Sequence, residues 1–413
     1  MIGIRREDKN RWERRVPLTP DHVAELVRTG VPVVVEPSPI RAFPDDAFRR
    51  AGAAVASDLT GCPLVVGVKE IPAEKLHPGT AYAFFAHVVK GQPWNMPMLR
   101  RLMELECTLV DYERILDDRG RRLVFFGRHA GFAGMLDTLW ALGQRLAFEG
   151  IDSPFAALTM AHRYADLEDA HVALGRVAAS IRRDGVPPAL HPLVVGFTGS
   201  GNTSKGAQEI FDQLPYEEIL VEDLEGQMRG GELPHNLVYK VVFSRADRFD
   251  GVVARHLGHL TALVNGVYWE PGHPRVVTLD DLRRLFLDGA VSRLRVIGDI
   301  SCDLAGSIEA TVRATTPGDP VYVYDVAADE PVRGIAGRGP VILAVDNLPC
   351  ELPVDASAHF GDALLRFVPP MARCDWTRPF GALELPAEIA RAVVVHRGHL
   401  TPDYAYLERS VVA

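Results

Sequence analysis

Short apolar runs alternate with amphipathic stretches along the first third of the chain. Gly30–Glu36 and Pro63–Lys69 are rich in β-branched residues and are bounded by glycine or proline, which predicts two strands. Thr19 and Pro20, followed by apolar residues at helical spacing, predict a helix that continues to Val27. The same criteria predict helices over 45–54 and 97–106 and strands over 82–85 and 108–111. This alternation is typical of parallel β–α–β units.

A change of pattern near residue 130 indicates a domain boundary. Gly131–Phe148 is the longest apolar helical stretch, and buried helices of this length often connect domains. Beyond it, Leu193–Phe197 predicts a strand, followed by a glycine-rich loop, a helix over 207–213 and a strand over 219–221. Later strands are predicted over 238–243, 260–265, 295–300, 321–324 and 341–345, with helices from 348 onward and a last apolar segment over 392–396.

These patterns predict an α/β protein with two Rossmann-like lobes, whose parallel sheets flank a central cleft. The length of 413 residues fits two domains of ordinary size. We expect residues 1–130 and about 348–413 to form a substrate and catalytic domain. Residues 131–347 are expected to form a dinucleotide-binding Rossmann domain.

The composition narrows the class of protein. Apolar residues make up 47% and charged residues 24% of the chain, as in a globular enzyme, and the net charge of −9 argues against a nucleic-acid partner. No apolar run reaches the ~18 residues of a membrane span, and the arginine-rich first segment lacks the apolar core of a secretory signal. The five cysteines form no CxxC pair, which favours reduced thiols over disulfides or a metal site. We therefore expect a cytoplasmic protein.

A glycine-rich loop follows the strand over 193–197 and leads into a helix. This is the context of a dinucleotide fingerprint, in which Gly199 makes the tight turn and Gly201 leaves room for a pyrophosphate at the helix N-terminus. Ser204 stands where the third glycine usually falls, and Gly206 comes two positions later. The alternative is a strand-to-helix turn that uses glycine only for packing. The residues expected to bind the cofactor here are Gly199, Ser200, Gly201, Asn202 and Thr203.

The residues after the next predicted strand bear on which dinucleotide is bound. Glu222 follows the next predicted strand, where an acid would bind the ribose 2′-hydroxyl of NAD. An arginine at that position would instead favour NADP. Lys205 is an alternative partner for a 2′-phosphate. The residues alone thus lean towards NAD.

Polar side chains follow successive predicted strands of the first lobe. Lys69 and Glu70 follow one strand and His87 follows the next, so parallel strands would bring them to one edge of the sheet. A lysine that is partly buried beside other cations has a lowered pKa, and histidine titrates near neutrality, so both suit proton transfer. The alternative is a set of unrelated surface charges. Nearby polar candidates are Lys90 and Gln92 after the same strand as His87, Glu113 after the following strand, and Arg15 as a carboxylate fork.

Several sequence strings resemble one known family. Residues 2–7 and 13–20 look like the opening of the alanine dehydrogenase and saccharopine dehydrogenase superfamily. Further strings resemble the lysine-ketoglutarate reductase half of the aminoadipic semialdehyde synthases, and the match covers nearly the whole chain. These strings are residues 82–87, 111–113, 120–122, 127–134, 197–207, 265–270, 299–303 and 346–349. The string over 299–303 adds Asp303 to the expected cofactor-binding residues.

The resemblance implies a reaction and a set of roles. The ε-amine of L-lysine condenses with 2-oxoglutarate, and NADPH reduces the imine to saccharopine, whereas fungal saccharopine dehydrogenases form lysine with NAD. The residues that match the family's acid–base groups are Lys69 and His87. The matching substrate residues are Arg15 and Arg122 for carboxylates, Lys90 and Gln92 in the pocket, and Glu70 and Glu113 beside the acid–base groups.

The whole-chain resemblance outweighs Glu222, so we predict NADPH, with NADH as the alternative. The expected partners are a small amino acid and a 2-oxo acid. Three other functions stay open: the same chemistry on a different amine or oxo acid, an ammonia-using enzyme, and a dinucleotide sensor without activity. The presence of both Lys69 and His87 argues against the sensor. We find no counterpart of the second catalytic domain of the bifunctional relatives and leave a homo-oligomer open.

Overall fold

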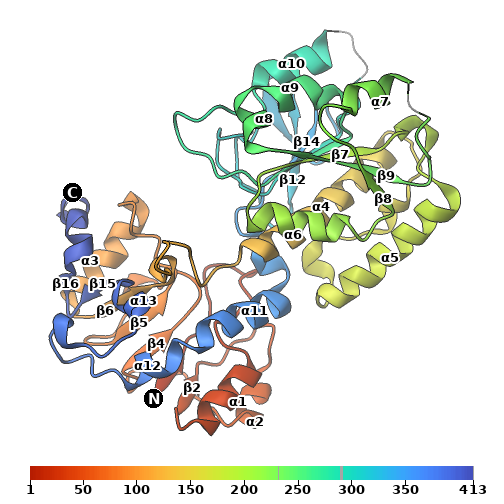
Figure 1. Cartoon of the computed structure of the whole chain (residues 1–413). Helices are drawn as coiled ribbons and strands as arrows, with labels where there is room; N and C mark the ends of the chain where they lie inside the picture. Colours follow the sequence, from red (N-terminus) through yellow and green to blue (C-terminus); the bar gives the residue numbers. More distant parts are fainter. Residues whose placement is uncertain (231, 289–291, 413) are drawn as a thin grey trace. The chain divides into compact units, whose positions relative to one another are not determined.

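The computed structural model describes residues 1–230, 232–288 and 292–412. Within these residues the chain folds into two α/β units, each built on a sheet of eight strands (Figure 1). Unit 1 comprises Met1–Phe126 and Pro353–Ala413, and unit 2 comprises Gly127–Leu352. No described helix is long and apolar enough to cross a membrane. The predicted α/β class with mostly parallel sheets is confirmed.

The sheet of unit 1 has the order β16-β15-β6-β5-β4-β1-β2-β3. The pairs from β6 to β3 are parallel, and only β15 and β16 pair antiparallel. The central strands are buried on both faces, because their sequences are continuous apolar runs. The strands are β1 (Ile2–Ile4), β2 (Val33–Val35), β3 (Ala54–Val55), β4 (Leu64–Val66), β5 (Ala81–Phe84), β6 (Thr108–Asp111), β15 (Val393–His396) and β16 (His399–Leu400).

The first helix of unit 1, α1, begins at a capping motif that the sequence provides. In α1, Thr19 and His22 form a reciprocal cap and Pro20 is the first helical residue. Val23 and Leu26 turn inward one helical turn apart. The helices are α1 (Pro20–Arg28), α2 (Asp45–Arg50), α3 (Met96–Glu104), α11 (Pro353–Leu365), α12 (Val368–Arg373), α13 (Ala387–Ala390) and α14 (Glu408–Val412).

The sheet of unit 2 has the order β13-β12-β14-β11-β10-β7-β9-β8. The strands from β14 to β8 are parallel, and β12 and β13 form an antiparallel edge. The second strand along the chain, β8, therefore lies at the sheet edge, and β9 takes the place beside β7. The strands are β7 (Val194–Thr198), β8 (Tyr216–Glu218), β9 (Val238–Phe243), β10 (Ala262–Asn265), β11 (Val296–Asp299), β12 (Val321–Asp325), β13 (Glu330–Arg333) and β14 (Val341–Leu343).

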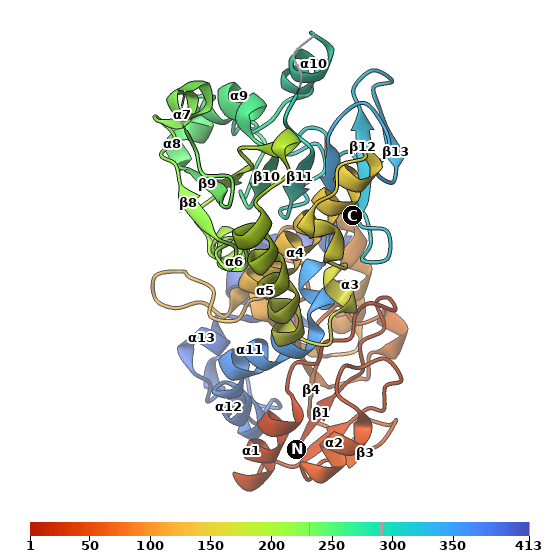
Figure 2. The same ribbon diagram turned by 90° about the vertical axis from the view of Figure 1, so that its right-hand side faces the viewer.

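Two sets of helices cover the two faces of this sheet (Figure 2). The helices α4, α5 and α6 share one apolar cluster with the strands, and α7, α9 and α10 share the other. The helices are α4 (Gly127–Phe148), α5 (Leu167–Asp184), α6 (Asn202–Phe211), α7 (Leu224–Gly230), α8 (Arg245–Phe249), α9 (Val252–His256) and α10 (Leu279–Leu287).

Some elements differ from the sequence prediction. The strand β1 has only three residues and was not predicted, because its short apolar run lies inside a charged segment. The strand predicted over 219–221 lies instead at Tyr216–Glu218, whose residues are too polar for a hydrophobic pattern to mark. The helix predicted to begin at 207 begins at Asn202, because the loop glycines end earlier than the sequence suggested.

Candidate active site

The glycine loop connects β7 to α6 and depends on glycine at its first position. Gly199 has a φ of +89°, and a Cβ there would lie 2.6 Å from the carbonyl oxygen of Gly266. Any other residue would be strained and would collide with the chain after β10. Around Gly201, by contrast, no heavy atom of the described residues lies within 4 Å of the hypothetical Cβ. The space beside Gly201 is therefore open, as the approach of a pyrophosphate requires.

A later glycine allows α6 to pack directly on α4. A Cβ on Gly206 would lie 2.2 Å from the carbonyl oxygen of Arg128. On the facing helix, a Cβ on Gly131 would lie 2.1 Å from the carbonyl oxygen of Thr203. Gly206 thus has the packing role of the third fingerprint glycine, and Ser204 is a buried residue of the same helix. This contact fixes the N-terminus of α6 beside the loop.

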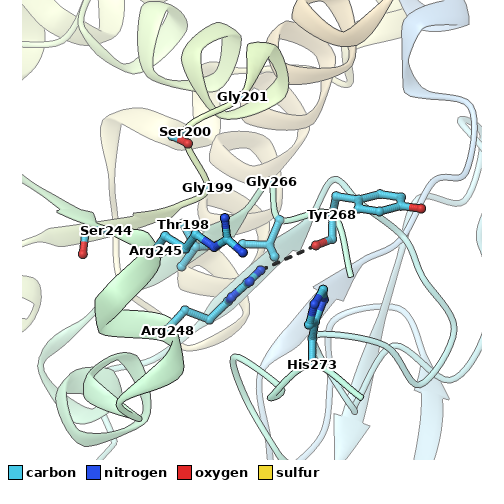
Figure 3. Close-up of a pocket in the computed structure, with 11 residues that line it drawn as sticks. Thr198, Gly199, Ser200, Gly201, Ser244, Arg245, Arg248, Gly266, Tyr268 and His273 are labelled. Carbon is cyan, nitrogen blue, oxygen red and sulfur yellow. Dashed lines mark hydrogen bonds between the residues drawn. The ribbon is translucent and has the colours of Figure 1, made fainter. Parts of the chain in front are cut away.

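A pocket of about 340 Å³ opens in front of the glycine loop (Figure 3). Arg248 is 9% exposed, and its Nη1 lies 3.5 Å from the carbonyl oxygen of Tyr268. Its buried Nε has no hydrogen-bond partner among the residues that the structure describes. Burial and the positive charge of Arg245 both lower the pKa of Arg248. An anion bound in this pocket would accept a hydrogen bond from Nε and would balance the buried positive charge of Arg248. The pocket is lined by Thr198, Gly199, Ser200, Gly201, Ser244, Arg245, Arg248, Gly266, Val267, Tyr268 and His273.

Glu222 lies outside the described lining of the loop pocket. Its proposed contact with a ribose required the preceding strand to lie next to β7, but β9 occupies that place and β8 lies beyond it. Ser244 and Arg245 follow β9 directly and line the pocket of the glycine loop. Glu222 lines an adjoining pocket together with Glu218, and Ser244 belongs to the described lining of both pockets.

The remaining predicted cofactor residues lie at or near strand ends of unit 2. Asn202 and Thr203 form the first turn of α6, directly after the loop. Asp303 is half-buried in the segment after β11 and is absent from the described lining of the loop pocket. The residues of the loop itself, Gly199 to Gly201, line that pocket.

The polar residues predicted in the first lobe follow three neighbouring parallel strands of unit 1. Lys69 and Glu70 come after β4, His87 after β5, and Glu113 after β6. The carboxyl ends of these strands lie at one edge of the sheet, which brings the side chains together. The turn after β5 is unusual, because His87 has a φ of +50° and its carbonyl oxygen accepts a hydrogen bond from Asn95.

Glu70 and His87 form the closest contact of this group. Glu70 Oε1 lies 2.6 Å from His87 Nδ1, and Lys9 Nζ lies 3.4 Å from Glu70 Oε2. Burial would raise the pKa of Glu70, but the hydrogen bond with His87 and the charges of His87 and Lys9 lower it to about 2. An ionised Glu70 makes Nδ1 the hydrogen-bond donor. This leaves Nε2 of His87 as the nitrogen that can exchange a proton.

Lys69 is half-buried at the same edge. Burial, followed by the positive charges of Arg15 and Lys9, lowers its pKa. Glu13 and Glu70 oppose this shift. A lysine with a lowered pKa can lose and regain a proton closer to neutral pH.

Arg15 lies in a buried ion pair that the sequence pattern did not identify. Its Nε and Nη2 donate to the two carboxylate oxygens of Glu13 at 2.7 and 2.6 Å, and its guanidinium lies 4.2 Å from the ring centre of Phe126. This bidentate edge of Arg15 is thus occupied by Glu13. Glu13 and Lys9 are the residues of this site that the sequence did not reveal, because neither follows a predicted strand.

The other predicted substrate residues lie in two loops of unit 1. Arg122 Nη2 pairs with Glu113 at 3.0 Å, and the Arg122 side chain is 53% exposed. The backbone amide of Lys90 donates to the side chain of Gln92 at 3.2 Å. Arg122 thus offers an accessible cation, whereas Arg15 is enclosed.

Two family models match the chain, and together they cover more than half of it. The model of the alanine dehydrogenase/PNT N-terminal domain matches residues 3–133, and that of the C-terminal domain matches residues 274–403. The chain belongs to the alanine dehydrogenase/PNT family. Membership in this family marks it as an oxidoreductase that uses a nicotinamide cofactor, and the resemblance predicted from the sequence is confirmed.

Relatives in this family match along nearly the whole chain. It is 36% identical over 99% of its length to alpha-aminoadipic semialdehyde synthase of Rattus norvegicus and covers 48% of that protein. The synthase of Arabidopsis thaliana is also 36% identical, with 41% of it covered. The chain therefore spans about half the length, or less, of these relatives. A saccharopine dehydrogenase of Neurospora crassa, named NAD(+), L-lysine-forming, is 30% identical over 88% of the chain and 89% of that protein.

Solved structures of the family have the same fold. An L-alanine dehydrogenase superposes with a TM-score of 0.66 at 21% identity and covers 99% of both chains. A transhydrogenase from Sinorhizobium meliloti superposes with a TM-score of 0.56 at 16% identity, over 97% of this chain and 99% of that one. This chain therefore shares its fold with these two proteins.

Proposed function

We propose that the protein joins the ε-amine of L-lysine to 2-oxoglutarate and reduces the product to saccharopine with NADPH. The similarity to aminoadipic semialdehyde synthases over 99% of the chain supports this reaction class. The observation that carries the proposal is the half-buried Lys69, whose pKa is lowered, at the sheet edge where Glu70 binds His87. A site for imine formation needs such groups, because protons move at each step.

We assign the two halves of this task to the two units. Unit 1 provides the substrate and catalytic groups, and unit 2 provides the dinucleotide site. The residues of unit 2 fit the cofactor, because the glycine loop leaves open space at Gly201 and a pocket with two arginines lies in front of it. A bound, reduced nicotinamide would supply the hydride for the reduction.

Lys69 and His87 transfer the protons in this proposal. The amine of lysine must lose a proton before its nitrogen can attack the carbonyl carbon of the 2-oxo acid, and Lys69 in its neutral form accepts that proton. The carbinolamine then loses its hydroxyl group as water, and His87 donates the proton that this departure requires from Nε2. Each such step contributes roughly 10²–10⁴-fold to the rate.

The arginines hold the substrate carboxylates and adjust the acid–base groups. Arg122 is exposed, so its guanidinium can reach a carboxylate from solvent once its pairing with Glu113 is exchanged. Arg15 remains a proposed carboxylate site, although Glu13 occupies one edge of its guanidinium. Its charge also lowers the pKa of Lys69.

The choice of NADPH is supported by the residues after β9. Arg245 and Arg248 lie in the pocket of the glycine loop, and both guanidinium groups lie near the ring of Phe249, at 5.6 and 4.6 Å from its centre. This is the place in a Rossmann fold where an arginine accommodates the 2′-phosphate of NADP. Ser244 caps α8 through the amide of Asp247 and so fixes the start of this arginine segment.

A competition between nucleotides tests the cofactor choice. We expect 2′,5′-ADP to bind more tightly than 5′-AMP. Arg245→Ala should weaken the binding of 2′,5′-ADP by about tenfold, because one charge-assisted contact is lost, and should leave the binding of 5′-AMP unchanged. Arg229→Ala is the matched control, because Arg229 is an exposed arginine on α7. Equal binding of the two nucleotides would favour NAD instead, as in the named fungal relatives.

A rate assay tests the reaction itself. Oxidation of NADPH or NADH is followed with lysine, ornithine or ammonia against 2-oxoglutarate, pyruvate or glyoxylate. Lysine with 2-oxoglutarate and NADPH should give the highest kcat/KM. A higher kcat/KM with another amine or oxo acid would identify that compound as the substrate instead. A higher kcat/KM for saccharopine with NAD would favour the lysine-forming direction.

Replacement of Lys69 tests the catalytic assignment. Lys69→Met should reduce turnover by roughly 10²–10⁴-fold, because the proton acceptor is lost. Binding of the dinucleotide by unit 2 should be unchanged. Lys75→Met is the matched control, since Lys75 is a more exposed lysine of the same loop that pairs with Asp8. A Lys69→Met enzyme with the wild-type rate would refute the assignment.

A further inference from the structure

Glu7 is a buried carboxylate at the base of the Lys69 turn, and the proposed chemistry does not use it. It is 5% exposed and lies shortly after β1. Its Oε1 accepts a hydrogen bond from the amide of Val68 at 2.7 Å, and its Oε2 accepts one from the amide of Lys69 at 3.0 Å. A single side chain thus binds two consecutive amides at the end of β4.

The chain after β1 leaves the sheet, which explains why the amides of Val68 and Lys69 need a side chain as hydrogen-bond acceptor. The amide of Arg5 donates to the carbonyl oxygen of Val66, and β1 then leaves the sheet. On the other side of β4 the pairing continues, because the amide of Phe85 donates to the carbonyl oxygen of Val68. Within the described part of the chain, the segment after β4 therefore pairs through its backbone with β5 and no longer with β1. The oxygens of Glu7 replace the missing carbonyl groups, since buried amides must find an acceptor.

The surroundings of Glu7 leave it little freedom to shift. A Cβ on Gly67 would lie 3.3 Å from Glu7 Oε1 and 3.3 Å from the Cδ and Cγ of Arg5. Both side chains thus pack closely over the backbone of Gly67. Burial raises the pKa of Glu7 to about 7, and the charge of Arg5 and the two amide bonds oppose this shift.

We propose that Glu7 is a positioning residue for Lys69. By holding the amides of Val68 and Lys69, it fixes the direction in which the Lys69 side chain leaves β4, and hence the place of its amine beside Arg15 and Lys9. Glu7 itself exchanges no proton with a reactant. The inference rests on the proposed role of Lys69, and the experiments below separate the failure of one from the failure of the other.

The first test is Glu7→Gln. A glutamine keeps one acceptor oxygen and turns an NH₂ group towards the other amide, so one of the two hydrogen bonds is lost. We expect kcat to fall about 10- to 100-fold, because a displaced catalytic group costs that much, with KM and Kd for NADPH unchanged. Asp45→Asn is the matched control, because Asp45 accepts the amide of Ser38 at 3.2 Å elsewhere in unit 1. A wild-type kcat for Glu7→Gln, measured well below its melting temperature, would overturn the proposal.

A double-mutant cycle separates positioning from general damage to the fold. If Glu7 acts only through Lys69, Glu7→Gln should not slow the Lys69→Met enzyme any further. If the two losses multiply instead, Glu7 acts independently of Lys69 and the proposal is wrong. If Glu7 had a purely structural role, Glu7→Gln would lower the melting temperature of both the wild-type and the Lys69→Met protein, and its effect on the rate would not depend on Lys69.

Chemical labelling provides a readout that needs no turnover. The rate at which an amine-acylating reagent modifies Lys69 is measured by peptide mass spectrometry, with the exposed Lys205 as internal reference. Glu7→Gln should change the labelling rate of Lys69 and leave that of Lys205 unchanged. An unchanged Lys69 rate overturns the positioning role. A changed rate in a protein that does not convert lysine and 2-oxoglutarate supports positioning and rejects the proposed reaction.

Discussion

Replacing Gly131 with alanine would test how closely α4 must approach the helix that follows the glycine loop. A Cβ at residue 131 would lie 2.1 Å from the carbonyl oxygen of Thr203 and 2.6 Å from the amide nitrogen of Ala207. Both atoms belong to the backbone of α6, so no side chain can rotate out of the way. Because real Cβ contacts are essentially never shorter than 3.0 Å, α6 must retreat by about 1 Å.

The change in the free energy of unfolding caused by Gly131→Ala is the sum of two opposing effects. Overpacking of this kind costs about 1–3 kcal/mol, and the rigid backbone on both sides places Gly131→Ala at the upper end. Alanine recovers about 1 kcal/mol, because it is the better helix former. The net loss is therefore about 2 kcal/mol, which lowers the Tm of a unit of this size by about 4–8 °C.

The assay is thermal unfolding of unit 2, with titration of NADPH as a second readout. Gly175→Ala is the matched control, because Gly175 lies within α5 and its hypothetical Cβ meets no heavy atom of the described chain within 4 Å. This control should melt at or above the wild-type temperature. Gly131→Ala should also bind the nicotinamide dinucleotide more weakly, since the proposed site for its pyrophosphate is at the N-terminus of α6, which moves away. If Gly131→Ala melts at the same temperature as Gly175→Ala, the packing argument is refuted.

Three further variants test the buried charges. Burial raises the pKa of Glu351 to about 8 and that of Asp137 well above its usual value. The folded protein thus favours the protonated, neutral forms of Glu351 and Asp137. Their contribution to the free energy of unfolding is fully present below about pH 4.5 and is lost as the pH rises through about 8. Asp137→Asn should therefore melt higher than wild type at alkaline pH and show a flatter dependence of Tm on pH; a parallel curve would contradict this. Glu13→Gln should lower the unfolding free energy by about 3 kcal/mol in urea titrations, because Arg15 loses its buried charge partner, and an unchanged midpoint would argue against that cost. The pKa of Glu70 is lowered to about 2, so ionised Glu70 stabilises the folded protein above about pH 4.5, and this contribution is lost as the pH falls through about 2. On acidification, the Glu70→Gln variant should therefore lose less unfolding free energy than the wild type.

The local elements of the fold could be predicted because their signals are contained in short windows of sequence. The strands Thr108–Asp111 and Val238–Phe243 have the predicted bounds, since each is centred on apolar and β-branched residues. The placement of Lys69 and His87 at one sheet edge also followed from the sequence. Each residue comes directly after a strand, and parallel neighbours present their carboxyl ends together.

The ion pairs of the site could not be predicted in this way. Glu13 lies two residues before Arg15, a spacing that belongs to no regular element, and only the fold of this segment turns both side chains inward. Glu7 was equally hidden, because its partners are backbone amides more than 60 residues away in the sequence. Such contacts depend on where a strand leaves the sheet.

The sequence by itself determined the family, the α/β class, the glycine loop and the strand-end position of the acid–base candidates. Only the tertiary structure decided which strand lies beside β7, and with it whether Glu222 or Arg245 lines the pocket of the loop. The physical reason is that hydrophobic periodicity reports whether a segment is buried as a strand. It carries no information on the order of parallel strands, which is set by the packing of helices and connections across the whole sheet.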